Sequence, residues 1–391
     1  MKSLKSKIVA SVLAFTLVGG AFAINPNVAE AAGKPLNIKK VLNLPKDGVT
    51  TPAETFTFTF AKHSKNGDTK KAADLPKVND VTIEYLTTDS TDNDSTKAGK
   101  QLIKESADAL ASVDWKESGQ FTYTVTEKEP EIAHKTTDMT YSKAEYLVSV
   151  FVGKTDDGNG YEVKDIQIKK TKDDAGKDIT DPKKEGYTPG TDDDKKGNNF
   201  AFENNYDKKD GNDTPGGGPD IKPEDKKGFA LRKTVEDASN DDFKFKLTVN
   251  KPVGSNSADK TFTYKIVNKE GTAGAEQTVT YGTAKEDIIL KHNERLVFGK
   301  VLLGSEVTVE ETESGKYTGE VSSSSFNGTA GTTNTGFIGD QKGGNFVEFL
   351  NKKQTATGLL VDNLPFIALV TVAVAGIFFF IKNRQDEEAL A

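Results

Sequence analysis

The sequence predicts an all-β protein made of two tandem β-sandwich domains, and three observations support this fold class. First, short segments that alternate apolar and polar residues recur along the chain, as half-buried strands do. Second, clusters of Gly, Asn and Asp separate these segments, as the turns of a sandwich require. Third, the segments occur twice in the same order within 391 residues, a length that suits two ordinary domains.

The internal repeat defines the domain boundaries. Its segments, in order, are residues 36–42, 56–60, 123–127 and 200–204 in the first half and 229–235, 243–249, 307–311 and 346–351 in the second. We therefore predict one domain over residues 33–206 and another over residues 228–353. Residues 207–227 between them are rich in Gly and Pro and are expected to form a linker without a strand. Within the first domain, the apolar spacing over residues 96–113 favours a helix.

The N-terminus has the features of a secretory signal peptide. Three lysines precede an apolar stretch over residues 8–24, and a small-x-small cleavage site follows at residues 29–31. We predict that residues 1–32 are removed on export. The exported chain has no cysteine, so it cannot be stabilised by disulfide bonds.

The C-terminus, residues 354–391, combines four features in order. Thr357 and Gly358 precede a short spacer, an apolar run over residues 364–381 and a basic Lys382-Asn383-Arg384. A run of this length can cross a bilayer as a helix, and the basic residues after it hold that end in the cytoplasm. The arrangement resembles the sorting signal of sortase transpeptidases in Gram-positive bacteria. This resemblance implies cleavage between Thr357 and Gly358, transfer of the Thr357 carbonyl to an amine, and loss of the membrane segment from the mature protein.

Each predicted domain points one lysine, one glutamate and one asparagine toward its own core. Residues two apart share a face of a strand, so Lys40 lies among the aliphatic residues of segment 36–42. The full set is Lys40, Glu127 and Asn204 in the first domain and Lys233, Glu311 and Asn351 in the second. Unpaired burial of three such groups is costly. One interpretation is a buried ion pair with an asparagine hydrogen bond, but such pairs seldom repay their desolvation.

The alternative interpretation is a chemical reaction between these side chains. Desolvation lowers the pKa of a lysine and raises that of a glutamate, so both groups can be neutral. A neutral amine is a nucleophile, and a protonated carboxyl can polarise an asparagine amide. Attack of lysine Nζ on asparagine Cγ, with the glutamate moving the proton and ammonia leaving, gives an internal isopeptide bond. That bond joins the first strand of each domain to its last.

Two such domains between a signal peptide and a sorting signal resemble the T-antigen-like major (shaft) pilins of Gram-positive, sortase-assembled pili. The resemblance implies Ig-like sandwiches of the collagen-adhesin B (CnaB-like) type. It also implies two self-formed bonds, Lys40 to Asn204 assisted by Glu127 and Lys233 to Asn351 assisted by Glu311. These single-turnover reactions on the chain itself are the expected chemistry, so the chain is not expected to be an enzyme acting on other substrates.

The resemblance further implies a structural subunit that a pilus sortase polymerises covalently into a fibre anchored in the cell wall. Expected partners are other copies of the chain, the sortase, minor or tip pilins and peptidoglycan, and the precursor is held transiently in the membrane. In this family the lysine that accepts the next subunit lies shortly before the last strand of the first domain. Lys195 and Lys196 fit this position, and Lys208 and Lys209 are the competing pair. A singly displayed adhesin or minor pilin is the alternative function.

The composition argues against other classes of protein. The net charge is −7 and no basic patch is interleaved with aromatic residues, so nucleic acid is not an expected partner. The three histidines, His63, His134 and His292, are scattered, which gives no indication of a zinc site or a histidine-based catalytic triad. No cofactor or metal is expected.

Overall fold

The computed structural model describes residues 33–191, 195–313 and 315–353. The predicted signal peptide, the Thr357-Gly358 cleavage site and the apolar run over residues 364–381 lie outside these residues. Within the described part of the chain, no helix is long and apolar enough to cross a membrane.

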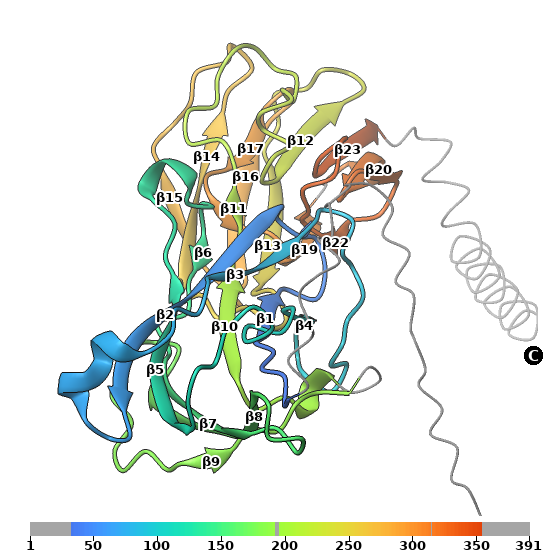
Figure 1. The fold of residues 1–391 in the computed structure, drawn as a ribbon. Coiled ribbons are helices and arrows are strands. Elements are labelled where there is room, and N and C mark those ends of the chain that lie inside the picture. The colour runs from blue at the N-terminus through green and yellow to red at the C-terminus, as the bar shows by residue number, and fades with distance from the viewer. Residues whose placement is uncertain (1–32, 192–194, 314, 354–391) are drawn as a thin grey trace, which may run out of the picture.

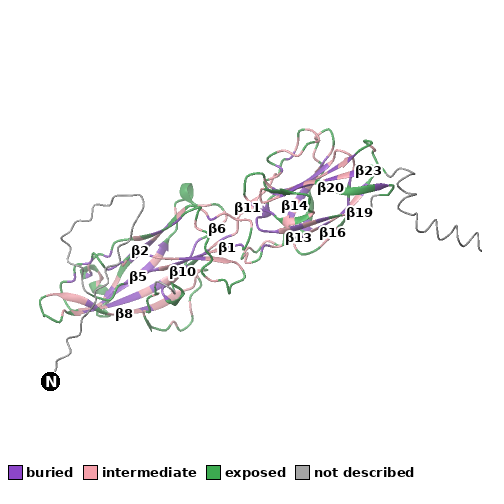
Figure 2. Cartoon of the chain, turned by 90° about the vertical axis from the view of Figure 1, so that its right-hand side faces the viewer, coloured by how far each residue is buried: buried purple, intermediate pink, exposed green. Residues whose placement is uncertain are grey.

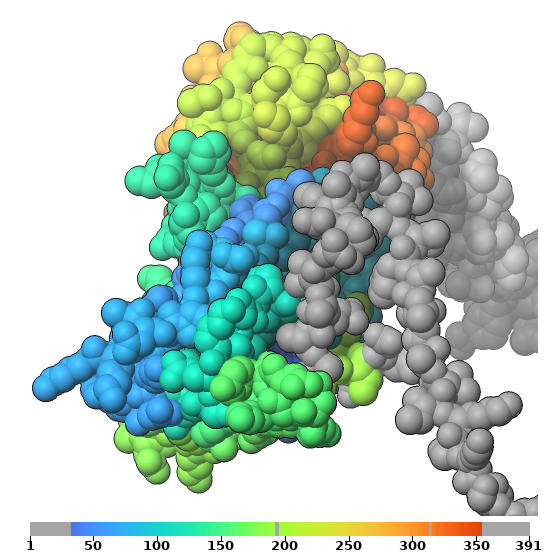
Figure 3. Space-filling model, viewed as in Figure 1, coloured from blue at the N-terminus to red at the C-terminus, as the bar shows by residue number. Residues whose placement is uncertain are grey.

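The described chain forms two β domains that lie end to end (Figures 1 and 2). In the space-filling view, the blue to green residues of the first half and the yellow to red residues of the second occupy separate parts of the surface (Figure 3). Each domain has its own cluster of buried apolar side chains. Helical structure in the described residues is limited to three 3-10 helices, η1 (Thr69–Asp74), η2 (Ile132–His134) and η3 (Lys195–Gly197). The predicted all-β class is confirmed.

The N-terminal domain consists of a four-stranded and a six-stranded sheet. The first has the order β4-β1-β10-β6 and the second the order β3-β2-β5-β7-β8-β9. The bounds are β1 (Lys39–Leu44), β2 (Glu54–Lys65), β3 (Val81–Tyr85), β4 (Lys100–Glu105), β5 (Gly119–Lys128), β6 (Met139–Thr140), β7 (Glu145–Lys154), β8 (Tyr161–Lys172), β9 (Glu185–Gly186) and β10 (Ala201–Tyr206). Alternation along β2 buries Phe56, Phe58 and Phe60 against the other sheet.

The C-terminal domain has a seven-stranded and a four-stranded sheet. Their orders are β15-β14-β17-β12-β23-β20-β21 and β16-β13-β19-β22. The bounds are β12 (Ala230–Val235), β13 (Phe243–Asn250), β14 (Thr261–Val267), β15 (Gln277–Thr280), β16 (Lys285–Leu290), β17 (Arg295–Phe298), β19 (Glu306–Glu313), β20 (Tyr317–Phe326), β21 (Thr329–Gly331), β22 (Thr335–Phe337) and β23 (Phe346–Lys353).

Both domains pair their first and last strands in parallel and in the same register. In the N-terminal domain, Leu42 of β1 lies opposite Asn204 of β10. In the C-terminal domain, Val235 of β12 lies opposite Asn351 of β23. Each asparagine therefore faces the residue two positions after the lysine, on the same side of the sheet as that lysine. The sequence repeat is thus also a repeat of strand pairing.

The helix predicted over residues 96–113 is wrong. Residues 100–105 instead form β4, which pairs with β1 along its whole length. The apolar residues that suggested a helical face are buried all the same, Leu102 in the strand and Leu110 and Val113 in the turns that follow it. The Asp108 side chain accepts the backbone N–H groups of Leu36 and Leu110 and so fixes those turns.

Residues 207–227, predicted as a linker without a strand, are ordered on the C-terminal domain. The short strand β11 (Lys209–Asp210) pairs with β18 (Val301–Leu302). Asp225 is fully buried and bonds Arg295 Nε at 2.9 Å, and Arg295 is fully buried as well. Strand β11 lies before Gly211, in a short stretch without Gly or Pro, so the chain can pair there as an ordinary strand.

The two domains are also joined by direct contacts. Val49 packs against both apolar clusters. Asp340 of the C-terminal domain accepts the Thr50 backbone N–H and lies 2.9 Å from Lys208 Nζ. Burial raises the pKa of Asp340, but the bonds from Lys208 and Thr50 outweigh it and leave that pKa below its usual value.

Candidate functional site

The first group of predicted site residues meets in the core of the N-terminal domain. Strand β1 supplies Lys40, β10 supplies Asn204, and β5, in the opposite sheet, supplies Glu127. Lys40 Nζ lies 2.6 Å from Glu127 Oε2, and Asn204 Nδ2 donates to Glu127 Oε1 at 2.7 Å. The Lys40 and Glu127 side chains are both fully buried. The carboxylate therefore bridges the amine and the amide.

The second group meets in the same way in the C-terminal domain. Asn351 Nδ2 donates to Glu311 Oε1 at 2.8 Å, and Lys233 Nζ lies 3.3 Å from the same oxygen. Lys233 and Asn351 are fully buried, and the Glu311 side chain is 6% exposed. As in the first domain, the glutamate comes from the opposite sheet, here on β19.

One phenylalanine ring lies close to the amine of each lysine, at the same distance in both domains. Lys40 Nζ lies 4.4 Å from the centre of the Phe56 ring, and Lys233 Nζ lies 4.4 Å from that of Phe243. The phenylalanine two residues after each of these rings lies opposite the glutamate in the sheet. Phe58 is paired with Glu127, and Phe245 with Glu311. These rings keep water from the polar groups and lower the local dielectric.

In both domains, burial shifts the pKa of the lysine and that of the glutamate toward one another, as proton transfer between them requires. It lowers the pKa of Lys40 and that of Lys233 to about 8 each, although attraction to the neighbouring glutamate offsets part of the effect. It also raises the pKa of Glu127 and Glu311, against the opposing influence of the lysines. The two pKa values of each pair therefore approach one another, and the state with a neutral amine and a protonated carboxyl becomes more accessible.

The two groups differ around the asparagine oxygen. Asn204 Oδ1 accepts the backbone N–H of Ser142 at 2.7 Å, within the buried core. Three atoms of the second group have no hydrogen-bond partner among the described residues: Asn351 Oδ1, Glu311 Oε2 and Lys233 Nζ.

Gly319 makes room for the second group. A Cβ atom at this position would lie 2.2 Å from Glu311 Oε2 and 2.8 Å from Asn351 Oδ1. The strand pattern predicts neither Ser142 nor Gly319, because a backbone N–H and a missing side chain leave no mark in polar–apolar alternation.

The lysine, asparagine and glutamate next to these residues in the sequence do not join the two groups, because consecutive residues of a strand point to opposite faces. Lys39 Nζ donates to the Lys196 carbonyl on the exposed side of β1, and Glu310 is exposed. Asn205 Oδ1 accepts the Asn43 side-chain amide, at the edge of the core.

The four lysines considered as acceptors lie in two places. Lys195 and Lys196 are exposed on η3, just before β10, and Lys196 Nζ lies 3.0 Å from Asp94. Lys208 and Lys209 lie after β10 at the junction of the domains. They form ion pairs of 2.9 Å with Asp340 and 3.2 Å with Asp259.

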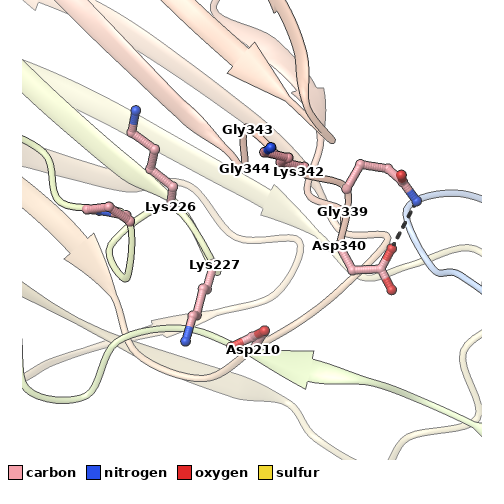
Figure 4. A pocket seen from close by; sticks show the side chains of 10 residues that line it. Asp210, Lys226, Lys227, Gly339, Asp340, Lys342, Gly343 and Gly344 are labelled. Atoms are coloured by element: carbon pink, nitrogen blue, oxygen red, sulfur yellow. Dashed lines mark hydrogen bonds between the residues drawn. The ribbon is translucent and has the colours of Figure 1, made fainter.

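A pocket of about 350 Å³ lies away from both groups, on the C-terminal domain (Figure 4). Its lining includes Lys226, Lys227 and the glycine-rich loop over residues 339–344. None of the six predicted core residues reaches it. Among the described residues, no group of three or more His, Asp or Glu side chains is arranged to hold a metal ion.

Comparison with known proteins matches each domain to a family model. Residues 36–207 match the family model of the Spy0128-like isopeptide containing domain. Residues 227–353 match a second family model, described as a domain of unknown function, DUF7601. No curated protein matches the chain. The resemblance that the sequence predicts is confirmed for the N-terminal domain, which matches a family of isopeptide-containing domains.

Solved structures similar to the chain include three of major pilins from Streptococcus pyogenes. One is 17% identical, with 82% of this chain and 99% of that chain covered and a TM-score of 0.32. A second is 19% identical, with coverages of 82% and 97% and a TM-score of 0.33. A third is 16% identical, with coverages of 84% and 100% and a TM-score of 0.29.

Proposed function

We propose that this protein is a structural pilin subunit, in which each domain closes an internal Lys–Asn isopeptide bond. One observation carries the proposal: both domains bury a lysine, a glutamate and an asparagine in the same strand register. A single buried ion pair is a common structural feature. Two copies of the same three residues, each with the carboxylate between amine and amide, favour a shared reaction.

The reaction follows from the contacts. A proton moves from the lysine ammonium to the glutamate, which leaves a neutral amine in a site screened from water. Lysine Nζ then attacks asparagine Cγ, and the glutamate gives a proton to Nδ2 and takes one from Nζ. The Cγ–Nδ2 bond breaks, ammonia leaves and the amide forms. Glu127 and Glu311 are the assisting residues, and each reaction occurs once per chain.

Such a bond would suit a fibre that carries load. It would join the first strand of a domain directly to the last, which are already neighbours in the sheet. Tension applied at the two ends of the domain would then pass through the covalent link instead of through the strand ladder. The chain lacks cysteine, so this link would serve where disulfides cannot form.

The same proposal includes covalent polymerisation. A pilus sortase would cut between Thr357 and Gly358 and transfer Thr357 to a lysine of another copy, with Lys195 and Lys196 as the acceptors. Their exposure just before β10 supports this choice over Lys208 and Lys209, which are half-buried at the domain junction. The product would be a fibre on the cell surface, linked to peptidoglycan, with minor pilins as further partners.

The test of polymerisation is the size of the protein in cell-wall extracts. A ladder of very large species that resists boiling is the expected result, and Lys195→Ala combined with Lys196→Ala should abolish it. Lys208→Ala combined with Lys209→Ala is the matched control and should leave the ladder intact. A single anchored band from the parent chain would favour a singly displayed adhesin or minor pilin instead.

A further inference from the structure

We propose that the backbone amide of Ser142 is the oxyanion donor for the N-terminal isopeptide bond, and that Asp174 positions it. The inference rests on the proposed bond-forming function and adds two participants to it. Neither residue belongs to the group of lysine, glutamate and asparagine that defines the site.

The geometry at Asn204 carries the assignment. Its two amide atoms have separate partners: Nδ2 donates to Glu127 Oε1 at 2.7 Å, and Oδ1 accepts the Ser142 N–H at 2.7 Å. The leaving nitrogen is therefore held by the acid, and the carbonyl oxygen by a fixed donor. Asn204 is fully buried and Ser142 is buried, so water does not compete for either hydrogen bond.

This arrangement matches the charge that the reaction develops. When Lys40 Nζ bonds to Cγ, the carbonyl π electrons move to Oδ1, which becomes an oxyanion. The Ser142 N–H already points at this atom and needs no reorganisation as the charge grows. When the Cγ–Nδ2 bond breaks, the electron pair returns from Oδ1, the carbonyl reforms and ammonia leaves with the proton that Glu127 supplied.

Asp174 fixes the distance between donor and acceptor from both sides. Its Oδ1 accepts the Ser142 hydroxyl at 2.6 Å and the Glu203 backbone N–H at 2.8 Å. Glu203 directly precedes Asn204, so one carboxylate oxygen holds the segment that donates and the strand that accepts. Its Oδ2 accepts Lys170 Nζ at 2.7 Å, which anchors the carboxylate in turn.

The strand beside the asparagine explains why the N-terminal domain has this donor. Strand β6 is only two residues long and ends at Thr140, opposite Asn205. The chain therefore leaves the ladder just before Ser142, and this N–H is available to a side chain. In the C-terminal domain, β20 continues alongside Asn351 with Gly319 opposite it, and Asn351 Oδ1 has no partner among the described residues.

The experiment measures the rate of N-terminal bond formation. The chain over residues 33–353 carries Asn351→Ala, so that only the first bond can form. Chain recovered unfolded from inclusion bodies, in which the bond has not yet formed, is dissolved in urea, refolded by dilution, and sampled for the mass of one lost ammonia. The fluorescence of Trp115, the single tryptophan, reports folding of the N-terminal domain in the same samples.

Ser142→Pro removes the donor and should slow the bond by about 100-fold or more, the usual effect of losing one oxyanion donor. Lys143→Pro is the matched control. It removes the adjacent N–H, which donates to the Asp174 carbonyl and not to Asn204, so it should slow the bond far less. Bond formation at the parent rate in a folded Ser142→Pro chain would overturn the proposal.

If Ser142→Pro does not fold, variants of Asp174 test the positioning of the Ser142 donor instead. Asp174→Ala should slow the bond about tenfold or more, whereas Asp174→Asn keeps an accepting oxygen and should restore the rate. A folded Asp174→Ala chain that reacts at the parent rate, or an Asp174→Asn chain as slow as Asp174→Ala, would overturn the positioning role. A parent chain that keeps its full mass would overturn the isopeptide itself, so the two failures are distinguishable.

Discussion

The two domains hold the same three residues in the same register, but they differ in what surrounds the asparagine. In the N-terminal domain, Asn204 Oδ1 accepts a backbone N–H. In the C-terminal domain, Asn351 Oδ1 has no partner among the described residues and lies beside Gly319. Strand pairing thus determines which side chains meet, whereas the neighbouring strand determines how they are hydrogen-bonded.

The difference has a structural cause and a kinetic consequence. Strand β6 has two residues and β20 has ten, so only the N-terminal domain frees an N–H next to its asparagine. We therefore expect the N-terminal bond to form faster than the C-terminal bond.

The largest effect should come from removing either asparagine. Asn204→Ala or Asn351→Ala prevents one bond, and the affected domain should lose about 5 kcal/mol of stability, the chain-entropy value for loops as long as residues 40–204 and 233–351. Calorimetry of the chain over residues 33–353 should show one transition shifted down and the other nearly unchanged. Asn205→Ala, beside the first site but outside it, is the control. Equal transitions in Asn204→Ala and Asn205→Ala would contradict a covalent link.

A second effect concerns the buried ion pair that belongs to the C-terminal domain. Asp225→Ala leaves Arg295 buried without its partner, so it should destabilise that domain by about 3–5 kcal/mol. The control is Asp220→Ala, because Asp220 is 67% exposed where it pairs with Arg232, and its loss should cost less than about 1 kcal/mol. Similar unfolding of both variants in urea would show that residues 207–227 are not anchored by Asp225.

A third effect should separate the two sites by their packing. Gly319→Ala places a methyl group against Glu311 and Asn351, and overpacking of this kind costs about 1–3 kcal/mol. In an Asn204→Ala background, the C-terminal bond should form roughly tenfold more slowly, as judged by intact mass over time. Gly331→Ala is the matched control, since its Cβ would meet nothing closer than 3.8 Å. Equal rates for the two variants would exclude a spatial role for Gly319.

The smallest difference between the domains should be in pH dependence. Lys40 and Lys233 both have a pKa lowered to about 8, and the reactive pair needs one proton shared between lysine and glutamate. Above about pH 8 the lysine loses this proton, so the rate should fall in both domains. At low pH the glutamate, whose pKa is raised above 4.5, stays protonated beside a charged ammonium, and the rate should fall again. Refolding at a series of pH values should give two similar bell-shaped profiles, and a rate that keeps rising to pH 10 would contradict the shared proton.

Much of this arrangement was predictable from the sequence because it depends on alternation. Residues two apart share a face of a strand, so Lys40 and Lys233 could be placed in the cores among apolar neighbours. The repeat then indicated that the same three residue types meet twice. Alternation also separates Lys39 from Lys40, and the structure places them on opposite sides of β1.

The rest depends on features without such a pattern. In the segment that became β4, apolar residues are spaced as on a helix, but pairing with β1 overrides local preference. The order of residues 207–227 depends on Asp225 and Arg295, which are 70 residues apart. The Ser142 donor is a backbone group, and any residue except proline would supply it at that position.

We propose above all that each domain forms its own isopeptide bond with the help of its glutamate. The intact mass of the chain over residues 33–353 tests it most directly, measured beside Glu127→Ala and Glu311→Ala. We expect the parent to lack the mass of two ammonia molecules and each variant to lack only one. A parent mass equal to the value calculated from sequence would mean that the buried lysines are only ion-paired and that neither isopeptide bond forms.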